Sequence, residues 1–528
     1  MSWVTAVPFD RLAGKPFVFR HGPRQIAVVR VEDEVFAIDN RCPHEGYPLA
    51  EGSIGPDCVL TCNWHNWKFR LRDGECVIGG DHVRTYPTRI DGGQVCVDVS
   101  PPPREVVQRQ ATRGLQSAFD DRDYGRVCRE IARLDYEGLD PLMAVRLALE
   151  WCHDRLEFGT THGMPATVDW LELAALGAGN REHRLICLAE AVDHVAFDGL
   201  RRRVHPYAGA GDPFDRDAFE TAIEAEDVAR AEGLVRRGLD DGLHWEDMEE
   251  AFLSAALAHY NDFGHSLIYV FKARQAVERL GRGVEPHLML PLARGIGYAT
   301  REDLIPEFRS YTPALGRLPE PRPSGSADAN RPPVPFPATM AEAFDWLGER
   351  LDRHSVEPVY DALLEALALN LLHFDTHYDT SADGPVSHNV GWLDFTHGVT
   401  FANAARRMCE RFPAFWKPAL AQMACFLGRN VEFLDPHVDR RPWQVDEPDD
   451  FFAGVYEHLL DHGLRDPIFA AHHLKTSLAV KDELPTASSS CRSSLLQALN
   501  RFLHSPIKAK HVRREARQAI SLVGRDYE

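Results

Sequence analysis

The chain has 528 residues, 44% of them hydrophobic, and a formal net charge of −20. This length allows two to four domains with sizeable cores, and the acidic balance argues against a nucleic-acid partner or an anionic membrane. The sequence has no run close to eighteen consecutive apolar residues and no signal-peptide pattern at its start, so we expect no membrane span. Its 11 scattered cysteines do not suggest a disulfide framework, and they indicate a reducing, cytoplasmic location.

The first hundred residues have the pattern of a small β domain. Residues 25–31 and 35–38 either alternate between polar and apolar side chains or are continuously apolar, as in short strands. Residues 95–99 have the pattern of a closing strand. The prolines at 101–103 end this pattern, because consecutive prolines cannot continue a strand or a helix. We therefore expect residues 1–100 to form one β-rich domain.

Two short motifs within this domain carry metal-binding residue types. Cys42 and His44 form C-x-H, and Cys62 and His65 form C-x-x-H after a gap of seventeen residues. A Cys₂His₂ zinc site uses the same ligands, but zinc fingers rarely carry C-x-H between such strands. The motifs and their flanking residues resemble the loops of Rieske ferredoxins and Rieske oxygenases. That resemblance implies a Rieske [2Fe-2S] cluster, with two thiolates on one iron and two imidazoles on the other, and transfer of single electrons.

From about residue 108 the composition changes to long helical periodicities with few β-branched runs. A stretch rich in Pro, Gly, Ser, Asp and Asn interrupts them and predicts a linker at residues 317–338. We expect two helical halves, residues 108–316 and 339–528, that together form one metal-binding domain. The predicted fold class is α+β multidomain, a small β Rieske domain followed by a large all-α, His-rich domain with an internal repeat.

The internal repeat is suggested by a segment that occurs in both halves. An Asp-Phe-x-His sequence runs from Asp262 to His265 and again from Asp394 to His397, and Ala-Arg and Glu-Arg pairs follow at the same offsets. The Thr-His-Gly sequence around His162 resembles the one around His397. A duplicated helical unit is the simplest explanation.

Histidines recur near the ends and starts of the expected helices. A single histidine on a helix is more often a surface or core residue than a ligand, but recurrence at matching places favours a metal site. Imidazole suits iron, zinc, copper or nickel, and inward-facing helices of a bundle can hold two metals. We therefore expect a multinuclear non-haem iron site, with Asp262 and Asp394 as catalytic carboxylates or as partners that orient the ligands. The candidate metal ligands are His153, His162, His259, His265, His373, His377, His397, His458 and His472.

The helical part resembles the questin-oxidase-like family over short motifs, in which a His-Gly pair precedes a helix containing Ala-Arg, as from His397 to Arg406. This resemblance implies oxidation of a small organic molecule of aromatic or polyketide type. Rieske oxygenase α-subunits instead bind one iron through an acid-x-x-His motif and a second His. The nearest copy here runs from Asn370 to His377 and begins with Asn rather than an acid.

The leading hypothesis from these features is a self-contained oxygenase. An external NAD(P)H-dependent reductase or a ferredoxin would reduce the cluster, which would pass electrons to two or more non-haem irons where O₂ and a small-molecule substrate react. The chain has no P-loop, dinucleotide fingerprint or nucleophilic triad. The alternatives are a mononuclear Rieske oxygenase with a divergent site at His373, His377 and an Asp, and a non-catalytic redox module. By analogy with Rieske oxygenases, we expect a homo-oligomer.

Overall fold

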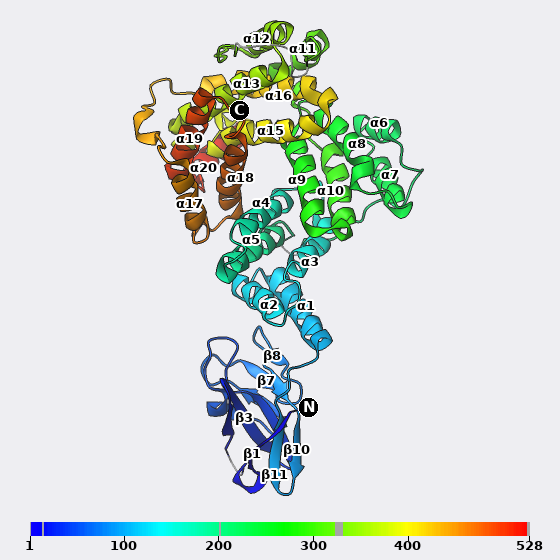
Figure 1. Cartoon of the computed structure of the whole chain (residues 1–528), viewed down its shortest axis with the longest axis vertical. Coiled ribbons are helices and arrows are strands. Elements are labelled where there is room, and N and C mark those ends of the chain that lie inside the picture. The colour runs from blue at the N-terminus through cyan, green and yellow to red at the C-terminus, as the bar shows by residue number, and fades with distance from the viewer. Residues whose placement is uncertain (1, 13–14, 200–201, 323–330, 525–528) are drawn as a thin grey trace. The chain divides into compact units, whose positions relative to one another are not determined.

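The structure is a computed structural model that describes residues 2–12, 15–199, 202–322 and 331–524 (Figure 1). The chain divides into two compact units, Met1–Pro141 and Leu142–Glu528. The first unit is built on strands and the second on helices, which confirms the predicted fold class of a small β domain followed by a large helical region. None of the helices in the described part of the chain has the length and apolar content that a membrane span requires.

The described part of the first unit contains three antiparallel sheets. One sheet has the order β1 (Trp3–Pro8), β11 (Gln94–Asp98), β10 (Thr88–Asp91). The second has the order β2 (Phe17–His21), β3 (Arg24–Val31), β4 (Glu34–Asp39), β9 (Thr85–Tyr86). The third has the order β5 (Ser53–Ile54), β6 (Val59–Thr61), β7 (Lys68–Arg70), β8 (Cys76–Ile78).

Strand β3 is buried on both faces, which explains its continuous apolar run. Residues 26–29 are each at most 1% exposed. Because successive side chains of a strand point to opposite faces, alternate residues of this run enter two different cores. Ala27 and Val29 pack in the core that contains Cys42 and Cys62. Ile26 and Val28 pack in the other core, with Val95 and Val97 of β11. The strand thus anchors the cysteine loops to the rest of the β domain.

Two helices, α1 (Arg104–Asp121) and α2 (Tyr124–Tyr136), complete the first unit. Helix α1 begins directly after the prolines at 101–103. The expected helical half from residue 108 therefore starts inside a helix of the first unit, and the unit boundary falls after α2. The division of the remaining helices into two halves stays a prediction, and part of the expected linker, residues 323–330, lies outside the described residues.

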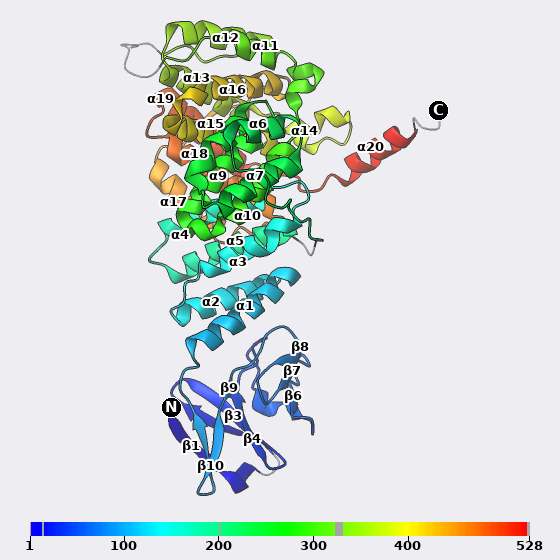
Figure 2. The same cartoon turned by 90° about the vertical axis from the view of Figure 1, so that its right-hand side faces the viewer.

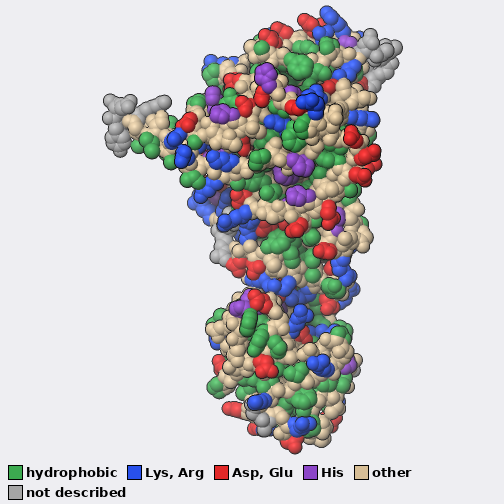
Figure 3. All heavy atoms as spheres, turned by 90° about the vertical axis from the view of Figure 1, so that its left-hand side faces the viewer, with side chains coloured by type: hydrophobic (Ala, Val, Ile, Leu, Met, Phe, Trp, Pro, Cys, Tyr) green, Lys and Arg blue, Asp and Glu red, His purple; other side chains and the backbone are tan. Residues whose placement is uncertain are grey.

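The second unit is helical throughout its described part. Its helices up to the predicted linker are α3 (Met143–Cys152), α4 (Gly163–Leu176), α5 (Arg181–Gly199), α6 (Arg216–Glu224), α7 (Val228–Asp240), α8 (Trp245–Leu257), α9 (His265–Leu280), α10 (Glu285–Gly297) and α11 (Tyr311–Arg317). Those after it are α12 (Met340–Arg353), α13 (Val356–His373), α14 (Thr376–Thr380), α15 (Trp392–Arg411), α16 (Trp416–Asn430), α17 (Pro448–Leu459), α18 (Pro467–Glu483), α19 (Ser489–His504) and α20 (Val512–Gly524). Figure 2 shows α20 extending away from the other helices of this unit, and none of its residues is buried. Acidic and basic side chains are interspersed on the face of the helical unit that Figure 3 shows.

Four helices of this unit, α4, α9, α15 and α18, pack in a closed ring, since α4 and α15 each contact both α9 and α18. Buried ion pairs join two of these contacts. Lys272 of α9 donates to Asp169 of α4 at 2.7 Å, and Arg406 of α15 donates to Glu483 of α18 at 2.9 Å. Paired burial of opposite charges offsets much of the cost of removing each from water. The ring is the scaffold from which four of the nine candidate metal-binding histidines project, namely His162, His265, His397 and His472.

Candidate functional site

The two cysteine loops of the first unit share one backbone conformation. In each loop the cysteine N–H donates to the carbonyl five residues ahead, at 2.8 Å for Cys42 and 2.7 Å for Cys62. The cysteine carbonyl then accepts from the N–H four residues ahead, which belongs to Gly46 or Asn66, at 2.8 and 2.9 Å. Both of these residues have positive φ, +79° and +62°, which Gly and Asn adopt more readily than other residues. The equivalent turns place each Cys at the same position, and the His follows it by two residues in the first loop and by three in the second.

The donor atoms of these loops face a shared space. The side chains of Cys42 and Cys62 are buried, and the rings of His44 and His65 lie 4.6 Å apart between centroids. Burial, together with the neighbouring Cys62, raises the pKa of the Cys42 thiol to about 11. The thiolate form that binds metal therefore needs the metal to stabilise it. Within the described residues, Nδ1 of His44 is buried without a hydrogen-bond partner.

The two histidines of these loops differ in their surroundings. The ring of Trp67 stacks on His44 at 4.6 Å and 15°, and it covers that imidazole. A side chain at Gly79 would meet Trp67 at 2.5 Å, so the glycine allows the indole to pack there. His65 is 41% exposed, with Glu45 at 3.7 Å from its Nδ1, and its neighbour Trp64 is 60% exposed. His65 is therefore the more exposed of the two histidines.

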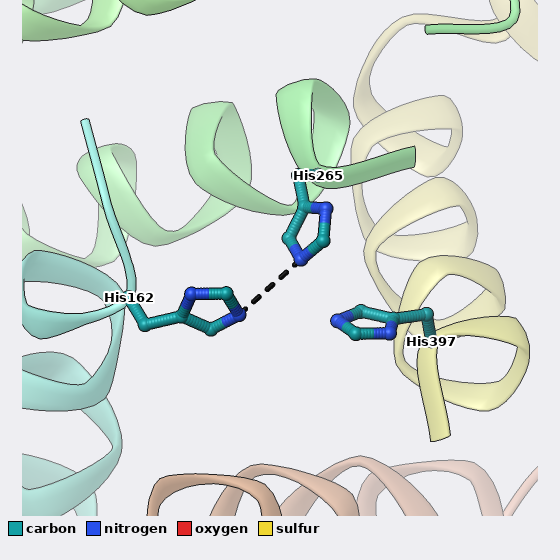
Figure 4. Close-up of side chains that lie close together, drawn as sticks. All are labelled: His162, His265 and His397. Carbon is teal, nitrogen blue, oxygen red and sulfur yellow. Dashed lines mark hydrogen bonds between the residues drawn. The ribbon is translucent and has the colours of Figure 1, made fainter. Parts of the chain in front are cut away.

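A second group of potential ligands lies in the helical unit, where three histidines meet (Figure 4). His162 precedes α4, His265 is the first residue of α9, and His397 lies in the second turn of α15. One ring nitrogen of each lies within 4.8 Å of the others, and the Nε2 atoms of His162 and His265 are 3.3 Å apart. The fourth helix of the ring, α18, adds His472, whose ring centroid is 5.2 Å from those of His162 and His397. Nε2 of His472 is buried and has no partner in the described structure.

These four imidazoles are held in the neutral form that binds metals. Burial lowers the pKa of His265 to about 4, and it lowers the pKa values of His162, His397 and His472 well below their usual range. The Lys475 ammonium contributes to each of these lowered pKa values, and its Nζ lies 3.2 Å from Nε2 of His397. Burial also lowers the pKa of Lys475 itself, to about 7.

Neighbouring groups set the orientation of His162 and His265. Asp198 of α5 accepts hydrogen bonds from the Thr161 hydroxyl and from the Gly163 N–H, at 2.7 Å for the latter, and so fixes the backbone on both sides of His162. A side chain at Gly163 would meet the Asp198 carboxylate at 2.4 Å. Nδ1 of His265 donates to the Asp262 carbonyl at 2.6 Å, which leaves Nε2 as the lone-pair nitrogen facing the cluster.

A cavity of 520 Å³ lies beside this histidine cluster. Its lining includes the residues flanking two of the histidines, namely Thr160 and Thr161 before His162, and Asp262 and Ser266 on either side of His265. Tyr269 also lines it, one turn along α9 from His265, with ring centroids 5.4 Å apart. A cavity of this size suits a small organic ligand.

Comparison with known proteins identifies the first unit. The Rieske [2Fe-2S] domain family matches residues 2–87. The ferredoxin component of the alkene monooxygenase system from Xanthobacter autotrophicus (strain ATCC BAA-1158 / Py2) is 31% identical over 97 residues, which are 18% of this chain and 80% of that relative. The chain belongs to the Rieske [2Fe-2S] domain family. The Rieske assignment from the Cys and His motifs is thereby confirmed at the level of the domain.

Other proteins are also similar to the Rieske unit. The ferredoxin subunit of 3-phenylpropionate/cinnamic acid dioxygenase from Escherichia coli (strain K12) is 33% identical over 76 residues, 14% of this chain and 72% of that relative. A solved structure, the ferredoxin of carbazole 1,9a-dioxygenase from Nocardioides aromaticivorans IC177, is 28% identical and covers 19% of this chain and 100% of its own, with a TM-score of 0.18. These relatives match less than a fifth of this chain, so they assign nothing to the histidine cluster of the helical unit.

The loop residues fit the cluster that this family binds. A Rieske centre takes two thiolates and two imidazole nitrogens, and the loops offer two buried thiols, the unpartnered Nδ1 of His44 and the nearby ring of His65. We propose Cys42, His44, Cys62 and His65 as its ligands. When bound, the cluster supplies single electrons.

The two carboxylates proposed as catalytic occupy different positions. Asp262 has a carboxylate oxygen 3.8 Å from Nδ1 of His265, and burial raises its pKa to about 6. Asp394 instead caps α15, accepting from the Gly391 N–H at 2.8 Å, and lies 3.7 Å from Arg429. The similar Asp-Phe-x-His sequences adopt different local structures, because Asp262 has a positive φ of 45° in a turn before its helix, whereas Asp394 lies inside the first turn of α15.

The structure brings four of the nine proposed histidine ligands together and separates the other five. His259 lies between two carboxylates at 2.8 and 2.5 Å, an arrangement that satisfies both ring nitrogens. His373 bonds a backbone carbonyl at 3.0 Å. His153 meets His287 edge to face, with ring centroids 4.6 Å apart. The remaining two, His377 and His458, are exposed.

Three residues that shape the site were not anticipated from the sequence. Lys475 and Tyr269 follow the cluster residues His472 and His265 by three and four positions, a spacing that places side chains on the same helix face and could have signalled both. Asp198 lies on a separate helix, 36 positions from His162, and no local pattern marks it.

Proposed function

We propose that this chain is an oxidoreductase that uses electrons from its Rieske unit to oxidise a small organic molecule with O₂ at a non-haem metal centre. The metal would be held by His162, His265 and His397. The observation that carries the proposal is the convergence of these three imidazoles, half-buried at His162 and His265 and buried at His397, within 4.8 Å of one another and beside the 520 Å³ cavity.

The chemistry of the donor set supports a redox metal, with iron as our proposal. Imidazole ligands suit iron, copper and zinc. Zinc has no redox chemistry, so it would make no use of the electrons that the Rieske unit supplies. One ion on three histidines is the smallest assembly. A second ion, as in a dinuclear centre, would draw on His472 and Asp262, which lie at the edge of the group.

The residues of the chain have distinct roles in this proposal. The exposed face at His65 and Trp64 would meet an external NAD(P)H-dependent reductase or ferredoxin. Trp67 would keep water from His44. The lining residues Asp262 and Tyr269 would lie between the metal and a substrate in the cavity. The similar proteins are ferredoxin components of oxygenase systems, which supports an oxygenase context.

A non-catalytic redox module is the alternative that one contact favours. Nζ of Lys475 lies 3.2 Å from Nε2 of His397, where it can donate to the lone pair that a metal would need. If this contact persists in solution, the histidines form a metal-free hydrogen-bonded group.

Metal and acid-labile sulfide content of the anaerobically purified full-length chain distinguishes these possibilities. We expect the iron and sulfide of one [2Fe-2S] cluster plus at least one further metal ion per chain. His162→Ala and His397→Ala should each lower the further metal and leave the cluster absorbance unchanged. His377→Ala changes an exposed histidine outside the group and serves as the matched control.

The complementary variant is Cys42→Ser, which should remove the cluster absorbance and leave the helical unit folded and able to bind its metal. O₂ uptake with an electron donor should then stop. A chain with no metal beyond the cluster, or histidine variants with the wild-type metal content, would refute the proposed metal centre.

A further inference from the structure

The helical hairpin α1–α2 lies outside the Rieske family match but belongs to the same compact unit. The family matches residues 2–87, whereas the unit extends to Pro141 and includes both helices. The hairpin lines a cavity of 660 Å³ through Val106 of α1 and Arg129 of α2, and His44 of the first cysteine loop lines the same cavity. The hairpin therefore encloses space beside one of the proposed cluster ligands.

A buried carboxylate joins this hairpin to the β domain. Asp81 lies in the loop between β8 and β9, and its side chain is only 1% exposed. Its carboxylate lies 3.3 Å from Arg129 and 3.5 Å from Arg133, both of α2. Arg133 also pairs with the buried Glu130 on the same helix. Removing one member of a buried ion pair is costly, because it leaves the other charge without compensation. Asp81 therefore ties the β8–β9 loop to α2.

The same loop connects α2 to the indole that covers His44. A side chain at Gly80 would meet Cδ of Arg126 at 3.1 Å and Cη2 of Trp67 at 3.3 Å, so this glycine lies between the two side chains. Arg126 of α2 is itself held by α1, because its guanidinium donates to the Gly114 carbonyl at 3.4 Å. Trp67 stacks on His44 at 4.6 Å. Direct contacts thus run from the hairpin through the loop to the covered imidazole.

We propose that Asp81 is a positioning residue for the Rieske cluster, which keeps the α1–α2 hairpin and Trp67 against the His44 side and so lowers the reduction potential. A reduced cluster carries one more negative charge than an oxidised one, and water stabilises that charge. Excluding water from the ligands therefore lowers the potential. The inference rests on the proposed cluster ligands and is independent of the metal centre proposed for the helical unit.

Redox titration of the full-length chain with its cluster loaded measures this effect. Asp81→Asn should change the equilibrium constant for cluster reduction by about threefold or more, which is a rise in midpoint potential of about 30 mV for a one-electron couple. Asp91→Asn is the matched control. It makes the same change at a carboxylate of β10 that is 71% exposed and lies outside the cavity, and it should leave the potential unchanged.

A second variant, Arg129→Gln, separates positioning from the effect of charge alone. Removing a positive charge would by itself lower the potential, because a nearby cation stabilises the reduced cluster. Loss of the ion pair with Asp81 should instead loosen the hairpin and raise the potential. We expect the potential to rise in both Asp81→Asn and Arg129→Gln. Shifts of opposite sign in the two variants would show that only charge acts, and would overturn the proposal.

Amide hydrogen exchange, followed by mass spectrometry, reports on the hairpin directly. Both variants should exchange faster than wild type in α1 and α2, with β3 equally protected in all. An unchanged potential in Asp81→Asn, or unchanged exchange in the hairpin, would overturn the proposal. If Asp81→Asn does not assemble a cluster, Arg129→Gln decides alone, since its potential must rise. Metal content of the helical unit should stay at the wild-type level in both variants, so this inference and the proposed function can fail separately.

Discussion

Gly264 offers a direct test of how the fold positions the histidine cluster. It has a φ of +79° at the N-cap of α9, immediately before His265. A side chain there would meet the buried ring of Phe401 at 2.6 Å and that of Phe426 at 3.1 Å. Gly264→Ala therefore imposes both left-handed backbone strain and a steric clash in a closely packed core.

The two effects can be given magnitudes. A left-handed conformation costs a non-glycine residue roughly 1–2 kcal/mol, and overpacking a core costs roughly 1–3 kcal/mol. Gly264→Ala should therefore lower the free energy of unfolding of the helical unit by about 2–5 kcal/mol. Because the strain and the clash at residue 264 would displace the adjacent backbone of His265, the metal content of the histidine cluster should fall as well.

Two matched glycines separate these contributions. Gly242 also has a positive φ, +87°, but a side chain there meets nothing within 4 Å, so Gly242→Ala should cost only the strain, about 1–2 kcal/mol. Gly283 has neither a positive φ nor a neighbour within 4 Å, so Gly283→Ala should change stability by less than about 0.5 kcal/mol.

The assay is urea unfolding of the full-length chain, followed by helix circular dichroism, which reports mainly the helical unit. Midpoints are compared at equal slope, because a changed slope would indicate a changed unfolding reaction. If Gly264→Ala is no more destabilising than Gly242→Ala, or if it keeps the wild-type metal content, the argument from close packing beside His265 is wrong.

Three further predictions concern buried charged and titratable groups. Glu483→Gln should remove the buried member of the three carboxylates that pair with Arg406, the other two being Asp482 and Glu410, and urea unfolding should show a loss of about 1–3 kcal/mol; a loss below about 0.5 kcal/mol would contradict a structural role for this pair. Asp198→Asn should weaken the hold on the backbone around His162 and lower the metal content, with a stability cost of about 1–3 kcal/mol; unchanged metal content would argue against this positioning role. Burial lowers the pKa of His473 to about 4, below its unfolded value of about 6.5, so its contribution to stability is present above pH 6.5 and is lost as the pH falls toward 4. His473→Gln should therefore reduce the loss of unfolding free energy between pH 7 and pH 5 by about 2 kcal/mol, and an identical pH dependence in the variant would count against this assignment.

The sequence by itself determined the class of the fold and the presence of a Rieske domain. Strand and helix periodicities are local, so they separated the β domain from the helical region, and β3, β4 and β11 lie within a residue or two of the expected strands. Each Rieske loop brings one Cys and one His together within four residues of chain, which makes the motif readable without tertiary structure. The boundary after α2 was not readable in this way, because helix periodicity does not reveal which unit a helix packs against.

Only the tertiary structure determines which histidines form the cluster. Its members come from four helices, and His162 and His472 are separated by 310 positions, so only the packing of α4, α9, α15 and α18 selects them from the nine histidines that recur along the chain. The same packing places His259 between two carboxylates and leaves His377 and His458 exposed to solvent. The local sequence pattern had predicted all three as metal ligands. Local patterns report on neighbours within one or two turns of a helix, whereas a site built from several helices depends on which of their faces meet.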